Sequence, residues 1–261
     1  MQPELSIVIP TFNEIDRLPK TIDEICPFLE VHFPLFEVII VDDNSPDGTI
    51  DYAKALAARD QRFKVLVQPF RIGKGAAVRR GCLAASGKLV LFMDADHATP
   101  IEEVIKFAKI AAEQTFDVIV GVRTYQEGES KWRRILGMIA QILAHLIVFE
   151  KAVFDSQCGF KLFTQSAAQK IFALCRVNGG MVDVELFYII HLLNLSCIYQ
   201  PVHWVNKAGS RISILHCILW DTLELLKIRL RRTINVYSSP LPAQAQPWIE
   251  SSNSLSILNR D

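Results

Sequence analysis

Strand-like and helix-like segments alternate through the first 122 residues of the chain. Short apolar runs rich in β-branched residues predict strands at Leu5–Pro10, Phe36–Val41, Phe63–Val67, Leu89–Met93 and Phe116–Val122. Apolar residues at helical spacing predict helices over Ile15–Phe33, from the turn that ends at Gly48 to about Asp60, and over Lys74–Ser86. A further helix is predicted from Thr99 onward, where Thr99 and Glu102 have the pattern of a capping box. Strands joined by helices of this length form parallel sheets with right-handed crossovers, so we expect a mostly parallel α/β sheet flanked by helices.

The net charge of the chain is an average over two unlike parts. The whole chain has 28 Lys and Arg against 28 Asp and Glu, which argues against a nucleic-acid binder. Residues 1–122 hold 13 basic and 18 acidic residues, a net charge of −5, whereas residues 123–232 hold 14 and 8, a net charge of +6. Six scattered cysteines include no CxxC pair, so we expect reduced thiols in a cytoplasmic protein rather than a zinc or redox site.

The second half contains two predicted amphipathic helices, Lys131–Phe149 and Ser213–Arg232. Neither is expected to span a membrane, because a span needs roughly 20 mostly apolar residues, and we find no signal peptide before the first strand. Their apolar faces fit either packing on the sheet or insertion into a membrane interface. The basic cluster Lys227–Arg232 favours the interface. Residues 233–261, rich in Ser, Pro, Gln and Asn, are predicted to form a mobile tail.

Polar residues follow three of the predicted strands. They are Thr11 to Glu14, the pair Asp42 and Asp43, and the sequence Asp94-Ala95-Asp96. The carboxyl ends of parallel strands are where such sheets bind ligands. Two alternate carboxylates suit a hard cation such as Mg²⁺ or Mn²⁺, which often bridges to substrate phosphates. A solvated acidic turn is the alternative, and the neighbouring polar strand ends favour the metal site.

The segment Arg71-Ile72-Gly73-Lys74-Gly75 precedes a predicted helix. Its glycines allow close approach of the backbone to an anion, the helix N-terminus favours negative charge, and Lys74 adds a full positive charge. The spacing is not that of a P-loop. A Gly-rich turn with an exposed Lys is the alternative interpretation.

The segments LSIVIPTFNE, VDDNSPDG, RIGKGAAVRRG and FMDADHATP resemble the nucleotide-sugar motifs of inverting family-2 glycosyltransferases with the GT-A fold. The later segments VGVRTY, DSQCGFKLF, VDVELFYI and KAGSR, with the helix DTLELLKIRLRR, resemble those of dolichyl-phosphate β-glucosyltransferases and, more distantly, of the mannosyltransferases. The resemblance covers about residues 5–232. It implies one GT-A domain with a nucleotide-sugar half, residues 1–122, and an acceptor half, residues 123–232, that carries the interfacial helices.

The resemblance also implies roles for individual residues. The nucleotide sugar would be bound by Pro10, Thr11, Phe12, Glu14, Asp42, Lys74, Asp94, Ala95 and Asp96, with Asp94 and Asp96 as the metal ligands. The acceptor phosphate would be held by Arg123, Lys161 and Arg211, with Asp155 as a further catalytic candidate. The sequence departs from the mannosyltransferases at Ala98, where they have a metal-binding Gln. At His97 the glucosyl group usually has a small residue, and we expect an exposed loop histidine rather than a ligand.

The implied reaction moves glucose from UDP-glucose to a polyprenyl phosphate of the dolichyl type and gives a β-linked product. An ionised phosphate nucleophile requires no strong general base. Transfer of mannose or another sugar, or transfer to a sugar hydroxyl with Asp155, Asp183 or Glu185 as base, is the alternative, and a non-catalytic nucleotide-sugar-binding subunit is a third. We expect a cytoplasmic protein peripherally attached to the membrane surface. A membrane-protein partner and a second copy of the chain both remain open.

Overall fold

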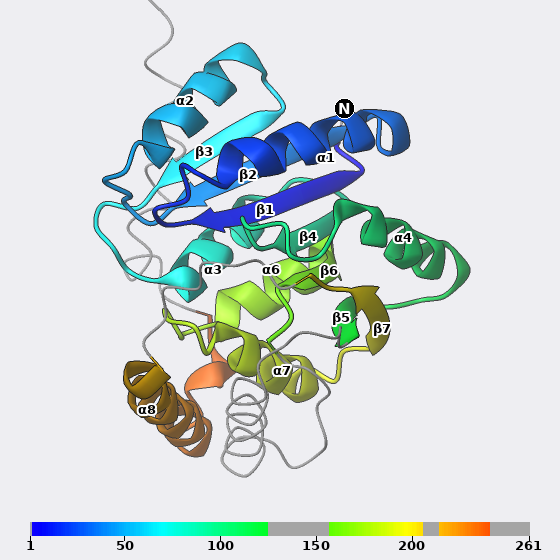
Figure 1. Ribbon diagram of the computed structural model, residues 1–261. Coiled ribbons are helices and arrows are strands. Elements are labelled where there is room, and N and C mark those ends of the chain that lie inside the picture. The colour runs from blue at the N-terminus through cyan, green and yellow to red at the C-terminus, as the bar shows by residue number, and fades with distance from the viewer. Residues whose placement is uncertain (1, 125–156, 206–213, 241–261) are drawn as a thin grey trace, which may run out of the picture.

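The computed structural model describes residues 2–124, 157–205 and 214–240, and in the last segment the side chains from residue 222 onward. These residues form a seven-stranded sheet between two layers of helices (Figure 1). The order of the strands is β3-β2-β1-β4-β6-β5-β7. The predicted α/β class is therefore confirmed.

The first four strands of the chain are parallel and carry the site. They are β1 (Leu5–Thr11), β2 (Phe36–Asp42), β3 (Phe63–Val67) and β4 (Leu89–Met93). Beyond β4, strand β6 (Phe160–Thr164) runs antiparallel to both of its neighbours. Strands β5 (Val118–Thr124) and β7 (Cys197–His203) pair in parallel at that edge.

Side chains from alternate positions of each strand enter two separate cores. In β2, Val38 and Ile40 face one core while Ile39 and Val41 face the other, and all four are fully buried. This burial on both faces is why these strands are continuous apolar runs in the sequence. One core lies under α1 (Leu18–His32), α2 (Thr49–Arg59) and α4 (Val104–Glu113).

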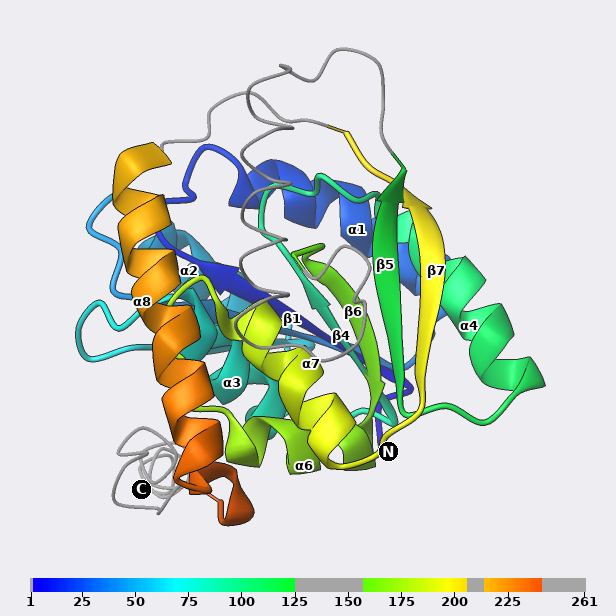
Figure 2. The same cartoon turned by 90° about the horizontal axis from the view of Figure 1, so that it is seen from below.

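The opposite face of the sheet is covered by α3 (Lys74–Ala84), α6 (Gln165–Leu174), α7 (Val182–Leu192) and α8 (Ile214–Thr233), as Figure 2 shows. Helix α6 has no counterpart in the sequence prediction, although its buried residues Ala167, Ala168, Ile171, Phe172 and Leu174 recur at helical spacing. Its N-cap is Thr164, whose side chain accepts a hydrogen bond from the Ala167 N–H.

The predicted capping box at Thr99 does not form. The chain instead enters α4 through a 3₁₀ turn, η1 (Ile101–Glu103), whose N-cap position, Pro100, makes no side-chain capping bond. The Ile101 N–H is satisfied by Nε2 of His97 at 2.8 Å. The ring of His97 thus takes the role that the sequence assigned to the Thr99 hydroxyl.

The folded domain extends past the predicted boundary at residue 232. Residues Val236–Ser238 form a 3₁₀ turn, η2, and Tyr237 is 3% exposed. Helix α8 buries Leu225 and Ile228 in the core, so packing accounts for one of its faces. The other predicted amphipathic helix, Lys131–Phe149, lies outside the described residues, as do residues 241–261. Among the described helices, none combines the length and the apolar character needed to cross a bilayer.

Candidate functional site

The carboxyl ends of β1, β2 and β4 lie at one edge of the sheet because these strands are parallel neighbours. Just beyond each of them the backbone adopts a left-handed conformation, at Asn13 (φ 57°), Asn44 (φ 64°) and His97 (φ 51°). Asn and His tolerate this conformation better than most residues. The three predicted polar clusters are therefore brought together, and each strand ends in a sharp turn.

Asp42 stabilises this edge of the sheet through hydrogen bonds of its buried side chain. Its side chain is fully buried and accepts hydrogen bonds from the Thr11 hydroxyl at 2.8 Å and from the N–H and hydroxyl of Ser45, each at 2.7 Å. The sequence predicted that Asp42 contacts the nucleotide base or ribose. The structure instead places it as a buried bridge that joins β1 to the turn after β2, with no exposed surface for a ligand.

Asp43, which the prediction did not select, shapes the Arg71–Gly75 turn. Its carboxylate accepts the N–H groups of Ile72 at 2.7 Å and Gly73 at 2.9 Å. Burial raises the pKa of Asp43, and these two N–H groups and Arg71 oppose that rise without cancelling it. The signal was present in the sequence, because Asp43 follows Asp42 at the same strand end.

The same turn is seated against residues Arg176–Met181, which join α6 to α7. Gly73 has φ 127°, and a Cβ added there would collide with the carbonyl oxygen of Asn178. A Cβ on Gly75 would lie 2.5 Å from the carbonyl oxygen of Val177. The Ala76 N–H donates to the Asn178 carbonyl at 3.2 Å. Glycine is thus required in this turn for close packing between backbones.

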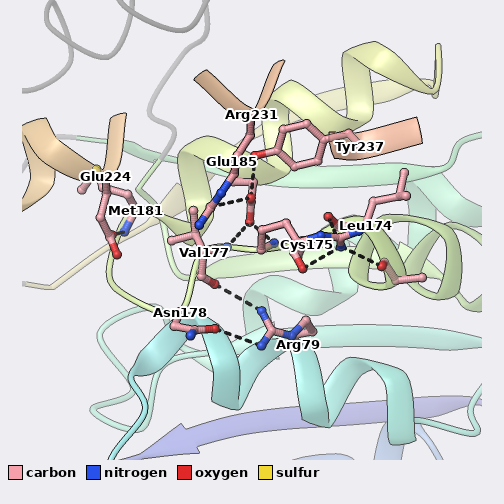
Figure 3. A network of polar contacts seen from close by, with 12 residues as sticks. Arg79, Leu174, Cys175, Val177, Asn178, Met181, Glu185, Glu224, Arg231 and Tyr237 are labelled. Atoms are coloured by element: carbon pink, nitrogen blue, oxygen red, sulfur yellow. Dashed lines mark hydrogen bonds and ion pairs between the residues drawn. The ribbon is translucent and has the colours of Figure 1, made fainter. Parts of the chain in front are cut away.

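A buried carboxylate, that of Glu185 in α7, accepts hydrogen bonds from the backbone of the connection between α6 and α7 (Figure 3). It accepts the N–H groups of Arg176 and Val177, both at 2.8 Å, and the hydroxyl of Tyr237 at 2.7 Å. Arg231 of α8 approaches it at 3.7 Å. Burial raises the pKa of Glu185 against these partners. Glu185 is fully buried in this network, so it is not a general base.

Lys74 and Asp94 meet at the centre of the edge. The Lys74 ammonium lies 2.7 Å from the Asp94 carboxylate, and both side chains are about one-third exposed. Burial alone would lower the pKa of Lys74, but Asp94, Asp183 and Asp96 outweigh it and raise that pKa. Asp94 is seated on Gly159, where an added Cβ would collide with its carboxylate. The Asp94 N–H donates to the Gly159 carbonyl at 3.2 Å.

Asp96 lies two residues further on and is partly exposed. One of its carboxylate oxygens accepts the Ala98 N–H at 3.0 Å, which fixes the side chain against its own turn. The intervening Ala95 is buried, and its carbonyl accepts the hydroxyl of Thr21 at 2.8 Å. The predicted contact between Ala95 and the nucleotide sugar therefore does not involve an exposed side chain.

His97 is not the exposed loop residue that the sequence suggested. It is 9% exposed, and its Nδ1 lies 2.5 Å from Glu24 while its Nε2 accepts the Ile101 N–H. Since Nε2 accepts a hydrogen bond, Nδ1 carries the ring proton and donates a hydrogen bond to the Glu24 carboxylate. Both ring nitrogens are engaged, so His97 is a structural residue and not a metal ligand.

Asp94 and Asp96 form a donor set that fits a hard divalent cation. Mg²⁺ and Mn²⁺ prefer oxygen ligands and are commonly held by one or two carboxylates together with substrate phosphates. No group of three or more His, Cys, Asp or Glu side chains gathers around a point in the described residues. These two carboxylates could therefore supply part of the coordination of such a cation, with water and a substrate diphosphate as further oxygen ligands.

The residues around the end of β1 lie at the same edge of the sheet. Phe12 is partly exposed, and the Arg71 guanidinium lies 4.1 Å from the centre of its ring. Burial raises the pKa of Glu14 to about 7 despite the opposing charge of Arg17, whose Nε lies 2.6 Å away. Pro10 is the partly exposed residue before the end of β1. The charge of Asp96 also acts on Glu14, and the role of these residues in nucleotide binding stays a prediction.

The predicted acceptor residues are only partly brought together. Lys161 is fully buried, and its ammonium lies 2.5 Å from both Asp183 and the Cys158 carbonyl. It therefore joins β6 to α7 and presents no surface to an acceptor phosphate, contrary to prediction. Arg123 is partly exposed at the end of β5. Asp155 and Arg211 lie outside the described residues.

Trp204, which the prediction passed over, lies beside the two aspartates. It lines a hollow together with Asp94, Asp96, Thr99 and Gly159, and the Arg123 guanidinium lies 5.4 Å from the centre of its ring. The available signal was an aromatic residue within the strand-like segment Cys197–Val205. Gly159 could likewise have been selected from the DSQCGFKLF segment.

Comparisons with known proteins agree with this geometry. The family model described as glycosyl transferase family 2 matches residues 6–172. A dolichyl-phosphate beta-glucosyltransferase of Drosophila melanogaster is 35% identical over 241 residues, covering 85% of this chain and 72% of its own length. The protein of the same name from Homo sapiens is 33% identical over 244 residues, covering 87% of this chain and 75% of its own.

Among solved structures, glucosyl-3-phosphoglycerate synthase from Mycobacterium tuberculosis, in complex with Mn²⁺, UDP-glucose and phosphoglyceric acid, has a TM-score of 0.65 and 20% identity. The match covers 92% of this chain and 81% of that one. Mannosyl-3-phosphoglycerate synthase from Rubrobacter xylanophilus has a TM-score of 0.59 and 17% identity, covering 92% and 78%. These likenesses show the fold alone. From the family match and the curated relatives, this chain belongs to glycosyl transferase family 2.

Proposed function

We propose that this protein transfers glucose from UDP-glucose to a polyprenyl phosphate of the dolichyl type, with inversion at the sugar carbon. The observation that carries the proposal is the contact between Lys74 and Asp94 beside Asp96, at the carboxyl edge of a parallel sheet. This arrangement suits a diphosphate that gains negative charge as it leaves. The dolichyl-phosphate beta-glucosyltransferases that the chain resembles support the choice of sugar and acceptor.

Lys74 has two alternative partners in this mechanism. Without donor its ammonium is paired with Asp94 at 2.7 Å. A bound diphosphate would offer the ammonium a second anion, while Asp94 and Asp96 would hold Mg²⁺ or Mn²⁺. Such a cation neutralises charge on the leaving diphosphate when bound. Lys74 then stabilises that charge from the side of the Gly73–Gly75 turn.

A phosphate acceptor also agrees with the state of the buried carboxylates. Transfer to a sugar hydroxyl needs a general base near the reacting carbon. Asp183 is paired with Lys161, and Glu185 is enclosed behind the site. An ionised phosphate oxygen attacks without losing a proton, so the work left to the protein is positioning and electrostatic stabilisation.

Peripheral attachment to a membrane is the second part of the proposal. The outer face of α8 and the residue after it expose Leu223 (48%), Leu226 (49%), Leu230 (58%) and Ile234 (62%). These four residues, which we call the α8 stripe, recur at helical spacing. The exposed Lys227 and Arg229 flank this stripe, whereas the Arg232 guanidinium lies on the inner side of α8, 5.8 Å from the centre of the Tyr188 ring. An apolar stripe with basic neighbours is typical of helices that lie in the interface of an anionic membrane.

The proposed reaction is tested by incubating the purified chain with Mn²⁺, a polyprenyl phosphate and a panel of nucleotide sugars. We expect a glucosyl lipid phosphate identified by its mass, with a β-anomeric proton signal. Asp96→Ala should lower kcat about a hundredfold or more, because it removes a ligand of the cation that would neutralise the leaving diphosphate.

The matched control is Asp51→Ala, which removes an exposed aspartate in the first turn of α2. It should retain wild-type turnover. A wild-type chain that glucosylates only water-soluble hydroxyl acceptors, or an Asp96→Ala variant with full activity at saturating donor, would contradict the proposal.

A further inference from the structure

We infer that Trp204 is a substrate-contacting residue, the wall against which the transferred hexose ring packs. The inference deepens the proposed function and relies on it for the identity of the donor. Trp204 immediately follows β7, one position after the last paired strand residue, His203. It thus lies at the same edge of the sheet as the two aspartates.

The hollow that Trp204 lines is small, and it adjoins the space that a donor sugar must occupy. Asp94 and Asp96, which face the diphosphate in the proposed mechanism, form one side of it, and Gly159 and Thr99 form others. The sugar is bonded to the terminal phosphate of the diphosphate. A sugar that leaves from a diphosphate held there must therefore occupy space next to these carboxylates.

Trp204 is the side chain suited to a sugar among the described residues that line this hollow. Phe160, the other aromatic residue of the lining, is fully buried, whereas Trp204 is partly exposed. Hexose rings present an apolar face of C–H groups, and aromatic rings contribute large contact areas in binding sites. The Arg123 guanidinium at 5.4 Å restrains the indole through a cation–π contact.

The backbone fixes the position of Trp204 relative to the aspartates. The Val205 N–H donates to the Ala98 carbonyl at 2.8 Å, and the Ala98 N–H donates to the Asp96 carboxylate at 3.0 Å. One residue thus ties the indole segment and the Asp96 side chain together. The small side chain of Ala98 also lines the hollow. A wall held this rigidly can select the sugar by shape.

The test compares binding of UDP-glucose and UDP to the full chain with Mn²⁺, by calorimetry. Trp204→Leu should weaken UDP-glucose binding about fivefold or more while UDP binding changes less than about twofold, because only the contact to the sugar is lost. Trp204→Phe should retain most of the affinity for UDP-glucose. Tyr199→Leu, which removes a partly exposed aromatic residue of β7 outside the hollow, should leave both affinities unchanged.

A second readout does not depend on the leucine variant folding. In the wild-type chain labelled with 5-fluorotryptophan, the ¹⁹F signal assigned to Trp204 through Trp204→Phe should shift further with UDP-glucose than with UDP. Equal loss of both ligands in Trp204→Leu, or identical shifts with both, would overturn the inference. The two proposals can fail separately. If Trp204→Leu weakens binding of UDP-glucose but not of UDP, and the wild-type chain transfers no glucose to polyprenyl phosphate, the proposed acceptor is refuted and the role of Trp204 stands.

Discussion

At the scale of single residues, the site depends on what surrounds each carboxylate. Asp42 and Asp43 are adjacent in sequence, yet one bridges β1 to the turn after β2 and the other shapes the Arg71–Gly75 turn. Neither offers an obvious free charge to a ligand. Asp94 and Asp96 keep exposed surface, and the position of the Asp94 carboxylate requires a glycine at position 159. The exposed aspartates at this edge are therefore the ones available to a ligand.

We predict that Gly159→Ala inactivates the enzyme without unfolding it. The added Cβ would collide with the Asp94 carboxylate, so that side chain must leave its position beside Lys74. A displacement of about 1 Å at a reacting centre can cost about a hundredfold in rate. The measurement is kcat at saturating UDP-glucose and Mn²⁺, together with the melting temperature. Gly180→Ala is the control, because its Cβ would meet no atom within 4 Å and should leave kcat unchanged.

Sequence reasoning identified residue types more reliably than it identified exposure. Asp94, Asp96 and Lys74 were selected and do lie together, because strand ends of a parallel sheet must converge. Lys161 and His97 were misjudged because their burial depends on Asp183 and Glu24, far away in the sequence. A charged residue after an apolar strand carries no mark of whether a distant partner neutralises it.

At the scale of elements, β1 and β2 are joined by a buried carboxylate on the far side from the site. Glu37 of β2 accepts hydrogen bonds from the Ser6 hydroxyl and from the N–H and hydroxyl of Ser86, and pairs with Lys64 of β3 at 2.6 Å. Burial by itself raises the pKa of Glu37, but these partners outweigh it and lower that pKa. One ionised group thus connects three strands at the edge opposite the ligand.

We predict that Glu37→Gln destabilises the fold only where the native carboxylate is ionised. Because the pKa of Glu37 is lower in the folded state, its ionised carboxylate stabilises the fold at pH values above its unfolded pKa of about 4.3. This stabilisation is lost as the pH falls through the folded pKa. The variant should be about 1–3 kcal/mol less stable near pH 7, as expected for hydrogen bonds to a charged group. Denaturant unfolding between pH 3 and pH 7 measures this, and a difference that does not shrink toward pH 3 would refute it.

Element types were predictable wherever apolar periodicity was strong. The predicted and observed bounds agree for β3 and β4, of which β4 is largely buried and β3 buries only Phe63 fully. Helix α6 was missed although its buried residues recur at helical spacing, because it is short and follows strand β6 without a loop between them. The antiparallel direction of β6 was also out of reach, since pairing direction is set by the connections and not by the strand itself.

At the scale of the whole molecule, α8 has two different apolar faces. Leu225 and Ile228 pack into the core, and the α8 stripe faces outward. The amphipathic pattern alone left core packing and membrane contact as alternatives. In the structure the inner residues pack into the core and the stripe is exposed, which is compatible with the proposed membrane contact.

We predict that the double variant Leu226→Glu, Leu230→Glu loses binding to vesicles containing anionic lipid. The two carboxylates would place charge in the apolar part of the interface and oppose attraction worth about 1 kcal/mol per basic residue. Co-sedimentation with vesicles is the measurement, and the melting temperature should change little because both leucines are exposed.

The matched control for the stripe is Ile228→Ala. This residue is fully buried, so its truncation should cost about 2–5 kcal/mol of stability while leaving vesicle binding intact at a temperature where the chain is folded. Vesicle binding that survives the double glutamate variant would show that another surface attaches the protein.

A substitution at Gly159 requires the Asp94 side chain to change its position or its identity. The carboxylate lies where any side chain at position 159 would have to begin, although the two positions belong to different halves of the chain. A related sequence that keeps both aspartates but carries a larger residue in place of Gly159 has lost the seat of the first one. The two aspartates alone are therefore an insufficient marker of a working transferase among chains of this kind, and the glycine must be read with them.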